Sequence, residues 1–458
     1  MLKIVRPMLA LIRSSVLLLL ACGPWKSAQA LPSFAEQTGL ACNICHTQSF
    51  GPNLTSYGRQ FKLRGYVDGG GSHPLKAPLA AMARGSFTHT DAGISGGPAQ
   101  GYGDQDNFAF DEASIFLAGR LAPKLGIFTQ LTYDDVASVV ALDNTDLRYA
   151  DAANLKGVEL EYGVTLNNAP TVQDPWNTTP VWGYPSASSP LAPTPGAAAL
   201  VDGGLDGQVA GVTAYVLVND ILYVEGGGYR RLSKGVQNAL GTFDSGQNEL
   251  RGTAPYWRLT LQNTDAGWAG HYVALGTFGM HAEVRPGRAT GIGTDTVTDI
   301  GADLTYQYST DPRHIFEAKA LYIWEDARLP ATGLAGGASN GSDRLNTFRI
   351  NGSYTWNQTL SLTAAYNGLW GSSDALRYVA SPIDGSRTGS PDSDSYSIEL
   401  AWVPFGKSGS YLAPYYNVRT ALMYTGYTKF NGAKHNYDGN GRDASDNNTL
   451  LLNIWFFM

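Results

Sequence analysis

The chain has 458 residues, of which 43% are hydrophobic and only 16% are charged, and its formal net charge is −7. An acidic balance without a basic cluster gives no electrostatic footprint for nucleic acid, so we expect no nucleic-acid partner. The sequence shows no P-loop, dinucleotide fingerprint or nucleophile triad, and it therefore gives no support to nucleotide-dependent or acyl-transfer enzymes.

Residues 1–30 have the pattern of a secretory signal peptide. Basic residues are followed by an apolar run and a small-x-small site: Lys3, Arg6 and Arg13, then Val16–Ala21, then Ala28–Ala30. We expect cleavage after Ala30, although a weak lipoprotein box at 19–22 would instead leave Cys22 acylated. No later stretch offers the roughly 18 consecutive apolar residues that a membrane-spanning helix needs.

The most informative motif is Cys42-Asn-Ile-Cys45-His46. In C-x-x-C-H, two thiols capture the vinyl groups of a haem, and the adjacent histidine becomes the proximal iron ligand. The alternatives are a disulfide and half of a zinc site, but zinc would need two further ligands nearby, and the closest candidate, His73, stands alone. We therefore predict one covalently bound c-type haem, attached to Cys42 and Cys45, with His46 on the iron.

The sixth iron ligand has three candidates near the end of the haem segment, namely Met82, His73 and His89. A methionine would raise the haem potential, whereas a second histidine would lower it. Each of the three could also be an ordinary linker or strand residue. We take Met82 as the first candidate.

Residues 31–80 predict a small helical domain and a linker. An apolar stripe with helical spacing ends at a glycine: Leu54, Tyr57, Phe61 and Gly65. A domain of about fifty residues buries little apolar surface and usually needs a staple. A covalently held haem would serve as one, and a linker around Val67 to Pro78 would tie this head to the rest of the chain.

From residue 81 to residue 458, the apolar pattern changes to strand periodicity with glycine-rich punctuation. In Lys156 to Leu166, for example, apolar residues alternate with polar ones, and alternation continues to Met458 at the end of the chain. There we expect Trp455 and Phe457 to thicken an aromatic girdle. Strands with one apolar and one polar face are typical of soluble sandwiches and of membrane barrels.

Loop lengths favour the membrane barrel, because tight connections such as Asn219-Asp220 and Asn357-Gln358 alternate with long ones. We predict an all-β fold: an antiparallel outer-membrane β-barrel of about sixteen strands, preceded by a small α-helical c-type cytochrome head. Short turns would be periplasmic, which places the head on the periplasmic side or within the lumen. The predicted strands are 82–90, 108–121, 124–134, 145–152, 156–167, 208–218, 221–232, 254–263, 267–280, 297–308, 312–326, 345–356, 359–371, 394–405, 411–428 and 449–458.

The longest loop runs from Asn167 to Gly207 and has a proline at every fifth position from Pro170 to Pro195. Proline at this density excludes ladder pairing and favours an extended, semi-rigid course. We expect this segment outside the barrel, either as a flap or lid or as an ordinary surface loop.

Carboxylates are the remaining candidates, since hard oxygen ligands suit hydrated first-row cations. Some lie in or beside the first external loop and others on predicted lumen faces: Asp104, Asp106, Asp111 and Glu112, and Glu159, Glu161 and Glu399. They would help to draw a cation in, or they are the ordinary polar surface of a porin.

Four segments carry a family resemblance: LPSFAEQTGLACNICH (31–46), YGRQFKLRGY (57–66), SFTHT (86–90) and NNAPTVQDPWN (167–177). With them, most of the mature chain resembles the fused monohaem cytochrome and porin of iron-oxidising bacteria. The resemblance implies a protein of the Gram-negative outer membrane, embedded in lipid, with extracellular Fe(II) as electron donor and a periplasmic c-type cytochrome as acceptor. Related fusions of the same layout serve other donors in principle, so the donor stays an expectation.

The expected function is that of an iron-oxidising electron-transfer cytochrome with one haem. A different class of function is a passive diffusion porin in which the haem head is a structural or sensory plug. Electron export to an external acceptor would use the same architecture in reverse.

Overall fold

A computed structural model describes residues 32–69, 78–263, 269–413 and 416–458. The expected signal peptide, with Cys22, and the candidate ligand His73 lie outside the described residues. Within the described residues, three short helices precede the barrel: α2 (Pro32–Thr38), α3 (Cys42–Cys45) and α4 (Ser56–Leu63). Helix α4 follows from the apolar stripe, and it ends just before Gly65, whose φ of +74° suits the left-handed residue after a helix.

The remaining chain forms one antiparallel sheet that closes on itself, because β1 pairs with both β17 and β2. The short strand β8 and the strand β9 both pair with β10, one after the other, so the seventeen labelled strands form a sixteen-strand barrel. The strands are β1 (Leu79–Thr90), β2 (Asp106–Ala122), β3 (Leu125–Asp134), β4 (Val139–Leu155), β5 (Val158–Asn167), β6 (Val209–Val218), β7 (Leu222–Arg231), β8 (Glu249–Arg251), β9 (Ala254–Gln262), β10 (His271–Arg285), β11 (Asp295–Asp311), β12 (His314–Arg328), β13 (Ser342–Trp356), β14 (Leu360–Gly371), β15 (Ser393–Trp402), β16 (Asn417–Lys429) and β17 (Thr449–Phe457). The loops contain α5 (Lys234–Ala239), α6 (Pro330–Leu334), η1 (Pro180–Trp182), η2 (Pro286–Arg288) and η3 (Ala444–Asn447).

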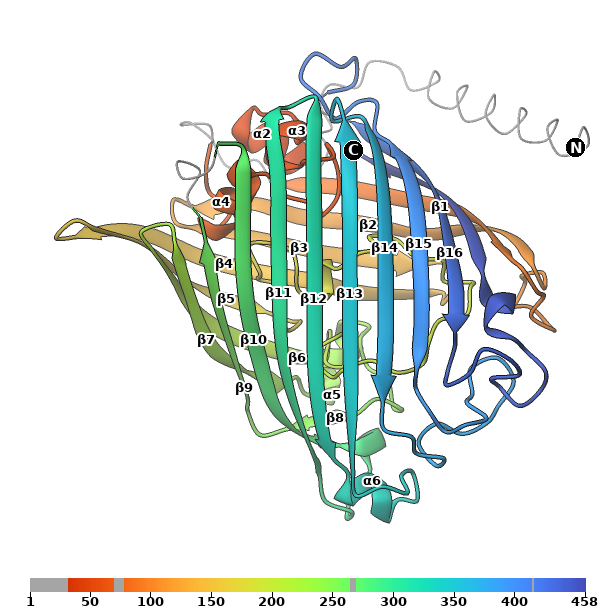
Figure 1. Ribbon diagram of the computed structural model, residues 1–458. Helices are drawn as coiled ribbons and strands as arrows, with labels where there is room; N and C mark the ends of the chain where they lie inside the picture. Colours follow the sequence, from red (N-terminus) through yellow and green to blue (C-terminus); the bar gives the residue numbers. More distant parts are fainter. Residues whose placement is uncertain (1–31, 70–77, 264–268, 414–415) are drawn as a thin grey trace, which may run out of the picture.

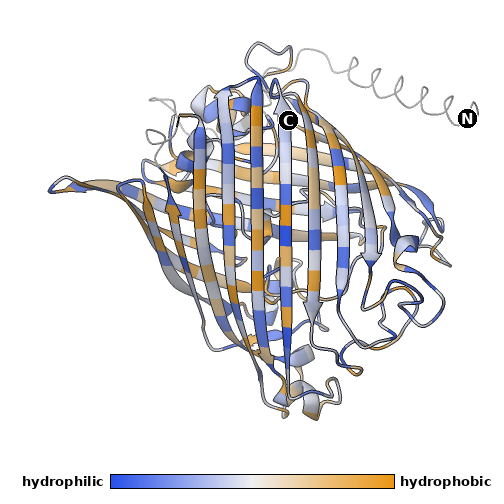
Figure 2. Cartoon of the chain, in the orientation of Figure 1, coloured by the Kyte–Doolittle hydropathy of each residue, from blue (hydrophilic) through white to orange (hydrophobic). Residues whose placement is uncertain are grey.

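The alternation of side chains sets the two faces of the wall, and Figure 2 shows it as bands of opposite hydropathy along the strands. In β5, Val164 and Leu166 are exposed on the outside, whereas Thr165 and Asn167 are buried on the inside. Large exposed aromatic side chains stand near both ends of the wall, with Trp356 at one end and Trp370 at the other. An apolar outside, a polar inside and aromatic girdles are the features of a transmembrane barrel. Among the described residues, no helix is both long and apolar enough to span a membrane.

The two ends of the barrel differ in their connections (Figure 1). Tight turns join strands at one end, where Asn219, Asp220, Asn357 and Gln358 adopt positive φ angles as predicted turn residues should. One connection at this end departs from the expectation, because β15 ends at Trp402 and β16 begins at Asn417 and not at 411. The expected turn at Thr264-Asp265 lies outside the described residues.

The segment 32–69 is inserted into the mouth at the end with the tight turns. The Asn43 amide donates to Gln358 Oε1 at 3.0 Å, and the Asn43 backbone N–H donates to the carbonyl of Gly406 at 3.0 Å. Deeper inside, the Arg59 guanidinium donates to Gln307 Oε1 at 2.7 Å. The helical segment is therefore held by both the rim and the inner wall.

The proline-rich segment corrects one expectation, because it lies inside the barrel and not outside it (Figure 1). We call residues 168–208 the lumen strap. It contains no strand, as the prolines predict, but Leu200, Val201 and Leu205 pack in a buried cluster with inward-facing barrel residues that include Tyr229 and Phe278. The strap folds inward because the inner wall offers apolar surface and hydrogen-bond partners along its length.

Candidate functional site

A cavity of about 430 Å³ lies between the helical segment, the inner wall and the lumen strap. The helical segment contributes Phe34, Phe50 and Phe61, the wall contributes Phe116, Phe128, Trp455 and Phe457, and the strap contributes Trp182. Ligand and cofactor sites typically enclose about 300–1,000 Å³ and are lined mainly by apolar and aromatic side chains. The cavity meets both criteria.

Cys42, Cys45 and His46 all line this cavity. Helix α3 presents the two cysteines, and the backbone N–H of His46 donates to the Cys42 carbonyl at 2.9 Å, which fixes the histidine at the helix end. Helix α4 approaches so closely that a Cβ on Gly58 would lie 2.2 Å from the Cys45 carbonyl oxygen. A glycine is required there.

Burial sets the protonation of the three motif side chains. Both cysteines are free thiols, and burial raises the pKa of Cys42 to about 11 and that of Cys45 to about 12. Burial also lowers the pKa of His46 to about 4, against the opposing effect of hydrogen bonds to the backbone of Gly51 and Asn53. A neutral imidazole held on one side by backbone groups is the form that binds a metal.

Met82 lines the same cavity, whereas the other described ligand candidate does not. Met82 is 6% exposed and belongs to a buried cluster with Phe50, Phe61 and Phe116. His89 lies on the opposite, outward face of β1, where its Nδ1 is 2.6 Å from Asp106 Oδ1. The structure thus brings Met82 close to the motif, and it excludes His89 as a ligand of an iron bound in this cavity.

These residues fit a c-type haem. One wall of the cavity holds two free thiols and a neutral histidine, the barrel wall holds a thioether, and aromatic side chains line the space between them. The Nδ1 atom of His46 is buried beside the backbone of Gly51 and Asn53, which leaves Nε2 as the ring nitrogen for a ligand. In the described ranges, no group of three or more His, Cys, Asp or Glu side chains could hold a metal ion on its own.

The inner end of the cavity is polar. A register shift between Arg84 and Gly85 of β1 lets two consecutive residues of β2, Asp111 and Glu112, both face Arg84. The Nε atom of Arg84 lies 3.2 Å from Asp111 Oδ2 and 3.3 Å from Glu112 Oε1.

Trp455 lies beside Arg84 on the neighbouring strand, and its buried Nε1–H has no hydrogen-bond partner. A buried donor without a partner lowers the stability of the fold by about 1–3 kcal/mol. Trp455 and Phe457 therefore line the cavity, and the expectation that they belong to a girdle was wrong.

The other predicted carboxylates do not converge on the cavity. Asp106 faces outward beside His89, and Asp104 lies in the loop after β1. Glu161 accepts hydrogen bonds from Gln60 and Arg64 of the helical segment, and Glu399 forms an ion pair with Arg419. Glu159 is exposed near the rim. Of the predicted set, only Glu112 lines the cavity, as Asp143 also does, and Asp111 contacts the cavity residue Arg84.

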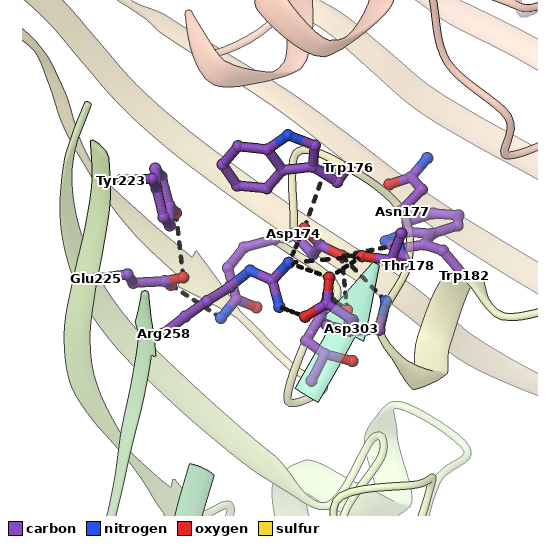
Figure 3. A network of polar contacts seen from close by, with 12 residues as sticks. Asp174, Trp176, Asn177, Thr178, Trp182, Tyr223, Glu225, Arg258 and Asp303 are labelled. Carbon is purple, nitrogen blue, oxygen red and sulfur yellow. Dashed lines mark hydrogen bonds and ion pairs between the residues drawn. The ribbon is translucent and has the colours of Figure 1, made fainter. Parts of the chain in front are cut away.

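A buried ionic network holds the tip of the lumen strap (Figure 3). Arg258 of β9 donates to both oxygens of Asp303 of β11, at 2.8 and 2.9 Å, and lies 3.3 Å from Asp174 of the strap. Asp174 also accepts backbone hydrogen bonds from Trp176 and Thr178. Burial opposes the ionisation of Asp174, but these partners outweigh it and lower the pKa of Asp174 to about 2.

The strap crosses the lumen from one wall to the other. Ser189 lies 2.6 Å from Thr88 of β1, while Arg258 belongs to β9, seven strands away in the sixteen-strand barrel. Further along, the backbone N–H of Leu200 donates to Glu325 and that of Val201 donates to Asp299, each at 2.7 Å. No pattern in the sequence signals this network, because its partners come from strands far apart in the chain.

Comparison with known proteins adds only a general likeness. No family model matches the chain, and no curated protein matches its sequence. Solved structures that resemble it include an anion-selective porin from Comamonas acidovorans (TM-score 0.44, 11% identity, covering 83% of this chain and 98% of that chain) and OmpT of Vibrio cholerae (TM-score 0.41, 10% identity, 83% and 96%). Similarity at this level carries no argument about function. The strand pairings themselves make the chain a closed sixteen-strand antiparallel barrel, as in porins, with a helical segment in its mouth and a strap across its lumen.

Proposed function

We propose that the chain is an electron conduit of the outer membrane, in which one covalently bound c-type haem accepts electrons from extracellular Fe(II) and delivers them to a periplasmic c-type cytochrome. The observation that carries this proposal is the cavity itself, which gathers Cys42, Cys45, His46 and Met82 at the mouth of the barrel. A bound haem would supply one-electron exchange between the ferric and ferrous states.

Each residue has a distinct part in this proposal. Cys42 and Cys45 form the thioether links, and His46 gives its Nε2 to the iron while backbone groups hold the other side of its ring. Met82 supplies the sixth ligand from strand β1, so the iron would join the helical segment to the barrel wall. The aromatic lining keeps water from the iron, which favours the ferrous state.

The charges beside the cavity support a cation as the donor. Arg84 lies two residues beyond Met82 along β1, toward the end with the long loops, and its partners Asp111 and Glu112 lie at the same level. Asp143 also lines the cavity. Carboxylates in a low-dielectric site raise the local concentration of divalent cations.

The lumen strap favours an electron conduit over a passive diffusion porin. A porin needs an open aqueous path, and the strap instead joins β1 to strands on the opposite wall through buried contacts. The porin with a haem plug remains the second candidate because the barrel fold alone suits it. Electron export would use the same cavity with the reverse direction of flow.

Anaerobic addition of Fe(II) to detergent-purified protein tests the proposal, with the haem absorption bands as readout. Prompt reduction of a covalent haem is the expected result. A haem that dithionite reduces but Fe(II) does not would favour the plug or the export reading. Protein without covalent haem would overturn the proposal entirely.

A further inference from the structure

Arg84 of β1 and Trp455 of β17 are directly opposed across the seam where the first and last strands of the barrel meet. Both side chains line the cavity, and the guanidinium carbon of Arg84 lies 5.5 Å from the centre of the Trp455 ring. Trp455 is 8% exposed, and its indole N–H has no partner. The seam therefore presents a buried donor that the protein itself does not satisfy.

Arg84 also has hydrogen-bond donors that its neighbours in the protein do not use. Its two ion pairs, with Asp111 and Glu112, both run through Nε. Its two terminal nitrogens make no hydrogen bond with any residue that the structure describes. Asp111 and Glu112 thus lie beside the Nε edge of the guanidinium. The two terminal nitrogens, Nη1 and Nη2, are left to bind a further carboxylate through two parallel hydrogen bonds.

The other cation at the cavity is already engaged. Lys62 donates to the carbonyl of Val172 at 2.8 Å and to Asn177 Oδ1 at 2.9 Å, and it stands over the ring of Trp182. Of the two cations that line the cavity in the described chain, Arg84 is the one with its donor groups unoccupied.

We infer that Arg84 and Trp455 form a carboxylate site in the barrel wall that binds a propionate of the haem. This inference rests on the proposed function, since it assumes the covalent haem. The thioether links and the propionates occupy opposite edges of a c-type haem. Helix α3 lies at the rim beside Gln358 and Gly406, whereas Arg84 lies roughly 7 Å deeper than Met82 along β1. The propionate edge would therefore point toward the seam.

The site gives the barrel a direct influence on the haem. A propionate left as a bare anion favours the ferric state, because its negative charge stabilises the more positive iron. Pairing with Arg84 and a hydrogen bond from Trp455 reduce that effect and raise the potential. Both residues act on the propionate and not on the iron, so they are positioning and binding residues for the cofactor.

The test uses full-length protein carrying its haem, with Arg84→Gln and Trp455→Phe as variants. Arg349→Gln and Trp370→Phe serve as matched controls, because Arg349 binds Asp202 in the strap and Trp370 is exposed on the outer wall. Haem content is measured first, followed by the midpoint potential and the propionate bending band in resonance Raman spectra. We expect unchanged haem content, a lower potential and a shifted propionate band in both variants, and none of these changes in the controls.

Wild-type potential and an unshifted band in both haem-loaded variants would overturn the inference and leave the proposed function standing. A wild-type protein without covalent haem would overturn both. If Arg84→Gln does not assemble, Arg84→Lys keeps the positive charge and removes the fork. It should then shift the propionate band, and an unshifted band in Arg84→Lys and in Trp455→Phe would count against the site.

Discussion

The carboxylate of Asp174 lies 3.3 Å from the guanidinium of Arg258, and neither side chain is accessible to solvent (Figure 3). Through this contact the strap is tied to β9 and, because Arg258 also binds Asp303, to β11. Removal of one partner from a buried ion pair costs about 3–5 kcal/mol, since the other charge is left uncompensated. The strap is therefore a fixed part of the lumen.

The wild-type barrel should conduct ions poorly in planar lipid bilayers, and Arg258→Gln should raise its conductance, because Asp174 and Asp303 would lose their cation and the strap tip would loosen. Arg313→Gln is the control, since Arg313 is an exposed residue paired with Asp311 at the rim. A wild-type conductance equal to that of an open sixteen-strand porin would contradict the sealed lumen.

The seal should persist in moderate acid. The pKa of Asp174 is lowered to about 2 in the folded protein, from an ordinary value near 3.8, so its ionic contacts stabilise the strap fully above about pH 4. This stabilisation is lost as the pH falls toward 2 and the carboxylate becomes protonated. Conductance recorded from pH 7 to pH 2 should rise only below about pH 3 to 4. Opening near pH 6 would show that another group controls the strap.

Met82→Ala should abolish the near-infrared sulfur-to-iron charge-transfer band of the oxidised haem and lower its potential, because a thioether ligand favours the ferrous state. Met423→Ala is the matched control, since Met423 is a buried methionine of β16 that contacts Tyr184 and does not line the cavity. A band that survives in Met82→Ala and disappears in Met423→Ala would show that the methionine ligand comes from β16 and not from β1.

Glu112→Gln should slow haem reduction by Fe(II) by roughly twofold to tenfold and slow reduction by a neutral reductant much less, because one carboxylate that attracts cations is lost beside the cavity. The effect should shrink at high salt. Asp106→Asn is the control, since Asp106 is an acidic residue on the outer face. Equal slowing by both substitutions would mean that overall charge, and not the position beside the cavity, sets the rate.

The strands were predictable because each one has a polar face toward the lumen and an apolar face toward the outside. The resulting alternation can be recognised within the strand itself. The alternation from Val158 to Leu166, for instance, is a local pattern, and so are the turn residues Asn357 and Gln358. The helix α4 was predictable for the same reason. Strand β16 was placed too early because 411–416 are apolar and aromatic, whereas the strand begins only at Asn417.

The course of the strap was not predictable, because the prolines indicate only that it forms no strand. Its place in the lumen depends on Arg258 and Asp303, which are remote in sequence from Asp174. The pairing of Arg84 with Trp455 likewise exists only once the first and last strands close the barrel. The motif Cys42 to His46 is recognisable in the sequence because its five residues are contiguous, whereas the cavity around it is assembled from residues far apart in the chain.

The most direct measurement of the central claim is electron transfer across a sealed membrane. Proteoliposomes loaded with oxidised cytochrome c would receive Fe(II) outside under anaerobic conditions, with an iron-specific chelator inside to report any leak. We expect reduction of the enclosed cytochrome without iron entry, and no reduction with the Cys42→Ala, Cys45→Ala double variant. Iron that enters before the cytochrome is reduced, or equal reduction with the double variant, would contradict the central claim.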